Sequence, residues 1–191
     1  MKFMLGKKMK MTQIFNENGN VIPATLISAG PIEALQIKTK EKDGYEAVRF
    51  GLEKRDGKKR KGFKFLREFR TENPQLKIGD IIDVSVFEVG DKVVVSGISK
   101  SKGFQGVVKR HGFHGGPRTH GQKHSEREPG SIGGGLRTRV PKGMRMAGRM
   151  GGDRITVKNL KVVKIDKDNN QIFISGAVPG RKGTLLEIYG S

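Results

Sequence analysis

Four histidines, the only ones in the chain, lie within residues 111–124 and have spacings that could hold a metal ion. His111 and His114 are three residues apart, and His120 and His124 are four apart. A structural zinc site needs three or four ligands on a frame rigid enough to fix a tetrahedron. Here the intervening residues are rich in glycine and the surroundings are densely cationic, which opposes a divalent cation. We therefore expect no metal, and interpret these histidines as groups that stack on bases or bond phosphates.

Two further patterns in this region resemble catalytic motifs but lack essential residues. The stretch "GPRTHGQKH" (116–124) approaches a phosphate-binding loop, but Gln122 stands where the lysine must be and no apolar strand precedes it. Ser125 and Glu126 beside His124 make no triad, because nothing orients the imidazole or supplies an oxyanion hole. The sequence therefore predicts no enzyme, no cofactor and no small-molecule substrate.

Positive charge is the property that sets this region apart. The chain of 191 residues has 38 Lys and Arg against 19 Asp and Glu, a net charge of +19. Residues 99–154 alone hold 13 basic and three acidic residues, together with 14 of the 28 glycines. Such a segment cannot offset its ordering entropy by burial, so we expect a partner to hold it. Arginine and lysine bind phosphate oxygens, which makes a nucleic acid the expected partner.

Composition alone leaves two nucleic-acid partners open. A long loop suits threading into folded RNA better than lying on a duplex, so RNA is the first interpretation. The alternative is a DNA-binding architectural protein, which would bind duplex DNA comparably and bend it.

An anionic membrane is a weaker candidate for the partner. Trp is absent, no amphipathic basic helix is evident, and no apolar run approaches the ~20 residues of a membrane span. The absence of cysteine excludes disulfides and thiolate metal sites and suits a reducing compartment. We expect no membrane partner and a cytoplasmic location.

The elements that must position the basic segment are short strands on both sides of it. Gly30-Pro31 divides two of them, and Gly90-Asp91 predicts a hairpin between two others. Within "GFKFLREFR" (62–70), a helical spacing of Phe63, Leu66, Phe69 and Arg70 predicts one helix over 63–70. The alternative for this stretch is a basic surface loop. The sequence thus predicts a mainly β protein with an antiparallel β-barrel. The predicted strands are 20–29, 32–39, 46–53, 81–89, 92–99, 155–166, 171–176 and 184–190.

The order of several motifs goes beyond composition. "LGKKMKMTQIF", "SKGFQGVVKRHGF", "THG", "EPGSIG", "KGMRMAGRMGGDRITVKNLKVVKID" and "ISGAVPG" stand in the order and spacing of the bacterial large-subunit ribosomal protein L three family. The chain resembles this family from Leu5 to about Gly183, least closely in 54–80. The resemblance implies a structural protein on large-subunit ribosomal RNA that acts early in subunit assembly. It implies proteins L fourteen and L nineteen as neighbours.

The same resemblance implies a division of the chain. Residues 1–100 and 153–191 would form a β-barrel body that resembles the second domain of translation factors, with a small α+β insertion at about 54–80. Residues 101–152 would form an extended loop that threads through RNA towards the peptidyl transferase centre.

Candidate RNA-binding residues follow from the matched motifs and from the charge of the loop. The "PGSIG" turn at 129–133 belongs with them, and Phe104 and Phe113 offer flat faces to unstacked bases. The resemblance carries RNA contacts onto Lys102, Lys109, Arg110, His111, His120, Lys142, Arg145 and Arg149. The remaining predicted rRNA-binding residues are His114, Arg118, Lys123, His124, Arg137 and Arg139.

Overall fold

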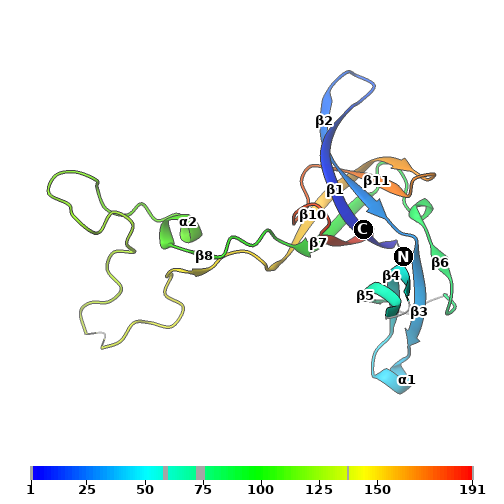
Figure 1. Ribbon diagram of the computed structural model, residues 1–191, viewed down its shortest axis with the longest axis horizontal. Coiled ribbons are helices and arrows are strands. Elements are labelled where there is room, and N and C mark those ends of the chain that lie inside the picture. The colour runs from blue at the N-terminus through cyan, green and yellow to red at the C-terminus, as the bar shows by residue number, and fades with distance from the viewer. Residues whose placement is uncertain (1, 58–59, 72–75, 137, 191) are drawn as a thin grey trace. The chain divides into compact units, whose positions relative to one another are not determined.

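The computed structural model describes residues 2–57, 60–71, 76–136 and 138–190. The chain divides into two compact units (Figure 1). We call Met1–Ser99 with Arg154–Ser191 the body, and Lys100–Asp153 the extension. The prediction of a mainly β protein is confirmed. None of the helices formed by the described residues is long and apolar enough to cross a membrane.

Six antiparallel strands of the body close into a barrel, in the order β1-β12-β7-β10-β11-β2. Strand β1 lies between β12 and β2, with Phe3 opposite Tyr189 and Phe15 opposite Val21. A closed sheet leaves few unpaired strand edges, which removes a common cause of edge-to-edge aggregation. The strands of the barrel are β1 (Phe3–Phe15), β2 (Val21–Ala29), β7 (Lys92–Ile98), β10 (Arg154–Asp166), β11 (Gln171–Ser175) and β12 (Leu185–Gly190).

A second antiparallel sheet has the order β5-β4-β3-β6. Its strands are β3 (Ile32–Lys38), β4 (Ala47–Gly57), β5 (Arg60–Arg70) and β6 (Ile81–Ile82). The one-turn helix α1 (Lys40–Asp43) joins β3 to β4 and ends at Gly44, whose φ of 79° suits glycine. This sheet reaches beyond the insertion predicted at 54–80, on both sides of it.

The two sheets of the body share one hydrophobic core. Phe3 of β1 stacks on Phe69 of β5 with ring centroids 4.5 Å apart, and contacts Phe50 of β4 at 5.4 Å. Met4 and Leu5 are fully buried as well. Burying a side chain of this size contributes about 1.5–3 kcal/mol, so this junction is a major source of stability for the body.

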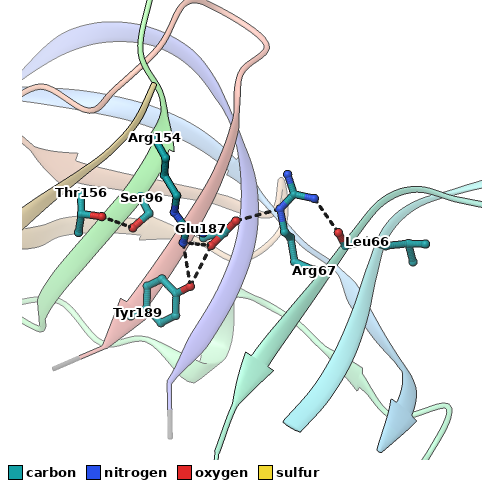
Figure 2. A network of polar contacts seen from close by, with 7 residues as sticks. All are labelled: Leu66, Arg67, Ser96, Arg154, Thr156, Glu187 and Tyr189. Atoms are coloured by element: carbon teal, nitrogen blue, oxygen red, sulfur yellow. Dashed lines mark hydrogen bonds and ion pairs between the residues drawn. The ribbon is translucent and has the colours of Figure 1, made fainter. Parts of the chain in front are cut away.

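A polar cluster, which we call the Glu187 network, spans the same junction (Figure 2). Glu187 of β12 is only 8% exposed. Its carboxylate accepts hydrogen bonds from Arg67 Nε of β5 at 2.9 Å, from Arg154 Nη2 at the start of β10, and from the Tyr189 hydroxyl at 2.9 Å. Burial raises the pKa of Tyr189, and the hydrogen bond to Glu187 raises it further. The network thus satisfies a buried charge with partners from three strands.

The helix predicted over 63–70 is wrong, because these residues belong to strand β5. Phe65 pairs with Leu52 and Phe69 with Val48 on β4. The ring of Phe63 packs over Gly51, where a Cβ atom would overlap it. Phe63, Phe65 and Phe69 fit the two-residue period of a strand, whereas the set of Phe63, Leu66, Phe69 and Arg70 fits a helical spacing. Only the partner strand selects between the two.

The strand predicted at 81–89 is wrong beyond Ile82. A 3-10 turn at Val84–Val86 follows, in which the Asp83 carboxylate accepts the Ser85 N–H at 2.9 Å. Such side-chain bonds to the backbone compete with strand pairing. The hairpin predicted at Gly90-Asp91 is also wrong, because β7 pairs with β10 and β12 instead.

Strand β1 was not among the predicted strands. At its start, Phe3, Met4 and Leu5 are all buried, so this part of the strand shows no alternation of apolar and polar residues. A strand that is covered on both faces loses the two-residue period by which strands are recognised. The strands predicted around 20–29, 32–39, 46–53, 92–99, 155–166, 171–176 and 184–190 are confirmed within a few residues.

Candidate nucleic-acid interface

The extension begins and ends in a short two-stranded ladder. Strand β8 (Phe104–Gln105) pairs with β9 (Gly148–Arg149), with Phe104 opposite Arg149. The Lys102 N–H donates to the Met150 carbonyl at 2.9 Å, and the Met150 N–H donates to the Gly103 carbonyl at 2.9 Å. These bonds hold the outgoing and returning chains together, so the extension is a closed loop.

A short helix, α2 (Val107–His111), follows β8 directly. It ends at Gly112, whose φ of 73° is favourable for glycine and whose N–H bonds back to the last turn. Three consecutive residues of its last turn are Lys109, Arg110 and His111. Cations at this end of a helix complement the partial negative charge of the free carbonyls.

The carbonyl oxygen of Met146 joins this helix to the returning chain. It accepts Arg110 Nη1 at 2.7 Å and lies 3.0 Å from His111 Nε2. Because a carbonyl can only accept, the His111 proton must sit on Nε2 in this arrangement. The Arg110 guanidinium passes over Gly148, where a Cβ atom would come within 2.6 Å of Nη1. Residues about 36 positions apart are thereby brought into one basic surface.

A cleft of about 530 Å³ lies beside this contact. Arg145 stands over the ring of Phe113, with its guanidinium carbon 5.5 Å from the ring centroid. Such stacking is attractive by about 0.5–1 kcal/mol at an exposed site and holds the cation over the ring. The cleft is lined by residues 111–116, Ser125, 128–130 and Arg145. Its walls include four glycines, whose bare backbone can approach a ligand closely.

A smaller loop, residues 115–126, projects from the extension and is closed at its neck. The Gly116 N–H contacts the carbonyls of Ser125 at 3.2 Å and Glu126 at 3.1 Å. Arg118 Nε donates to the Glu126 carboxylate at 2.7 Å. A Cβ atom at Gly115 would overlap the Glu126 carbonyl, so glycine is required there. His120 lies within this loop with a φ of 61°.

The structure places the predicted RNA-binding residues on the surface of the extension, with one partial exception. His111 is half-buried against Met146, and Arg137 lies outside the described residues. Helix α2, the Met146 carbonyl and strand β9 bring five of the candidates together, namely Lys109, Arg110, His111, Arg145 and Arg149. The other exposed candidates are Lys102, His114, Arg118, His120, Lys123, His124, Arg139 and Lys142.

Two exposed cations of the same unit, Lys100 and Arg127, were not among the predicted RNA-binding residues. Their charge alone would have placed them with the other candidates. The residues that orient the candidates, Met146 and Glu126, were not predicted either, because the sequence carries no local signal for them. Among the residues that the structure describes, no group of three or more His, Asp or Glu side chains is placed to hold a metal ion.

Comparison with known proteins identifies the family. The sequence profile of ribosomal protein L3 matches residues 72–174. The large ribosomal subunit protein uL3 of Herpetosiphon aurantiacus is 49% identical over 96% of this chain and 93% of its own length. The uL3 proteins of Finegoldia magna and Natranaerobius thermophilus are each 46% identical, over 98% and 100% of this chain and 97% of their own lengths. The chain belongs to the ribosomal protein L3 family.

Membership of the L3 family decides between the functional classes that composition left open. The chain is a structural, non-enzymatic constituent of the large ribosomal subunit, with its place in the cytoplasmic ribosome. The prediction of a ribosomal protein is confirmed, and the DNA-binding alternative is set aside. As an L3 protein it associates with ribosomal RNA and with other ribosomal proteins.

Proposed function

We propose that the extension, Lys100–Asp153, is the part of this L3 protein that binds large-subunit ribosomal RNA. The observation that carries the proposal is the exposure of charge. All eleven described Lys and Arg side chains of the extension are exposed, and the unit contains only three acidic residues. Three carboxylates cannot neutralise eleven cations, so the excess charge needs an external polyanion. In the ribosome that polyanion is RNA.

The arrangement of these cations supports a loop that inserts between RNA segments rather than a flat contact. Lys109 and Arg110 on α2 lie on the outgoing chain, while Arg145 and Arg149 lie on the returning chain. Cations on both chains of a closed loop can neutralise phosphates on both sides of it. Exposed Phe104, at 77%, and the histidines add flat surfaces on which unstacked bases can rest.

The proposal has a wider functional part, which rests on the resemblance to the family. In it, the protein promotes early assembly of the large subunit, the loop supports RNA near the peptidyl transferase centre, and the neighbours include proteins L fourteen and L nineteen. The barrel of the body would correspond to the second domain of translation factors.

Salt dependence of RNA binding tests the central proposal. Binding of the protein to a large-subunit rRNA fragment should weaken as the salt concentration rises. If about eight phosphates are neutralised, the logarithm of the binding constant should fall with the logarithm of the salt concentration with a slope of roughly −6 to −7. Replacing Lys109, Lys123 and Lys142 by Gln should reduce the magnitude of the slope by about 2 to 3. The matched control replaces Lys40, Lys42 and Lys182, three exposed cations of the body, by Gln. An equal effect of the control variant would show that the extension is not the principal RNA-binding surface.

A further inference from the structure

The β1–β2 hairpin carries an exposed apolar face. Side chains of one strand alternate between faces, and directly opposite residues of paired strands share a face. Phe15 pairs with Val21, and Gln13 pairs with Pro23. Met11 lies two residues before Gln13, on the same face. Phe15, Val21 and Met11 are 63%, 53% and 52% exposed. We call Met11, Gln13, Phe15, Val21 and Pro23 the hairpin face.

The opposite face of the hairpin behaves differently. Ala24 is fully buried, and Thr12, Ile14 and Ile22 are half-buried. The hairpin therefore already has a packed side, and the exposed Phe15 and Val21 contribute little to the stability of the body. An exposed apolar patch that contributes little to the stability of its own chain is typical of a surface that binds a partner.

The charge of this segment indicates which kind of partner it binds. Residues 11–31 contain no Lys or Arg, in a chain that has 38 of them, and their one charged residue is Glu17. Binding to RNA relies on cations that neutralise phosphates, and this face offers none of its own. Apolar and aromatic surface with few charges is instead the composition found at the core of protein–protein interfaces.

We propose that the hairpin face docks a neighbouring ribosomal protein, one that presents an apolar patch bordered by Lys or Arg. The apolar patch would cover Phe15, Val21 and Met11, and a bordering cation would pair with Glu17 at the turn of the hairpin. The inference rests on the place of the chain in the ribosome and is independent of the RNA contacts proposed for the extension.

Site-specific photocrosslinking in assembled large subunits tests this inference. A benzophenone amino acid in place of Phe15 should give an adduct that survives nuclease digestion. Its partner peptide, read by mass spectrometry, should be apolar with flanking Lys or Arg. The same amino acid in place of Phe104 of the extension should give an RNA adduct, which tests the proposed function separately. An adduct of position 15 with rRNA or with a second copy of this chain, or no protein adduct there, would overturn the inference.

A double variant, Phe15→Ser with Val21→Ser, gives an independent measurement. Because both side chains are mostly exposed, the variant should melt like the parent chain and bind rRNA with the same affinity. Retention of the crosslinked neighbour in salt-washed subunits should fall about 10- to 100-fold, as expected from the loss of buried apolar surface. Val89→Ser, at an exposed apolar residue outside the hairpin (66%), is the matched control and should leave retention unchanged. Unchanged retention in the double variant would overturn the inference.

Discussion

Replacing Glu187 by Gln should lower the free energy of unfolding of the body more than the loss of an exposed ion pair would. The reason is that the Glu187 carboxylate is buried, although its two arginine partners are partly exposed. The substitution keeps the shape of the side chain but removes its charge and turns one acceptor into a donor. That donor then faces either the Arg67 guanidinium or the Arg154 and Tyr189 donors (Figure 2). At least one of three hydrogen bonds is therefore lost, and the other two are weakened.

The size of the effect follows from the exposure of the partners. A hydrogen bond to a charged group contributes about 1.5–3 kcal/mol. The side chains of Arg67 and Arg154 are 46% and 56% exposed, so water can replace part of what they lose. We therefore expect a loss of about 2 kcal/mol in the free energy of unfolding. For a domain of this size that corresponds to about 4–8 °C in Tm.

Thermal unfolding followed by circular dichroism measures this loss, with Glu126→Gln as the matched control. The Arg118–Glu126 pair has side chains 82% and 46% exposed, and its loss should cost less than about 0.5 kcal/mol. A second measurement follows Tyr189, one of two tyrosines, by its absorbance at alkaline pH. In Glu187→Gln the pKa of Tyr189 should move back towards its ordinary value, because the hydrogen bond to a carboxylate is gone. If Glu187→Gln lowers the Tm no more than Glu126→Gln does, the network does not stabilise the body as argued.

Three further predictions concern other parts of the chain. Hydrogen bonds from Lys2 and from the Glu88 backbone N–H lower the pKa of Asp91. The contribution of Asp91 to stability is therefore present above its unfolded pKa and is lost as the pH falls through its folded pKa. Asp91→Asn should therefore shrink the drop in Tm between about pH 5 and about pH 2, and an unchanged drop would contradict this. Gly51→Ala should cost about 1–3 kcal/mol in denaturant unfolding, because the new methyl group overlaps the ring of Phe63. Gly106→Ala, which meets open space, is its control and should be close to neutral. Replacing residues 105–148 by Asn-Gly joins Phe104 to Arg149 through a two-residue turn. This variant should melt cooperatively at a Tm no lower than that of the full chain. The reasons are that loop-closure entropy changes little with loop length and that the shortened chain carries less mutually repelling positive charge. It should fail to support large-subunit assembly; normal assembly would show that the extension is dispensable.

Much of the local organisation could be predicted from residue order alone. The strand at 21–29 follows from a run of β-branched and apolar residues, and the turn before 171–175 follows from Asp168, Asn169 and Asn170. Both signals are properties of a few neighbouring residues. The charge and the glycine content that set residues 99–154 apart are also local properties, which can be counted from the sequence alone. Candidate cations within this segment were named for the same reason.

Pairing between distant segments could not be predicted in this way. Residues 63–70 satisfy both a helical and a strand period, and the choice between them depends on β4 as a partner. The start of strand β1, at Phe3, Met4 and Leu5, is buried on both faces only because the barrel and the second sheet enclose it.

Within the candidate interface, the sequence by itself determined which side chains carry charge, and the tertiary structure decided which of them meet. Arg110 reaches Met146 across 36 residues, and Arg145 stands over Phe113 across 32. The same holds for Glu187, whose partners lie 120 and 33 residues away. Charge and chain entropy are properties of each residue and its neighbours, whereas these contacts form only when the free energy of the whole fold brings distant residues together.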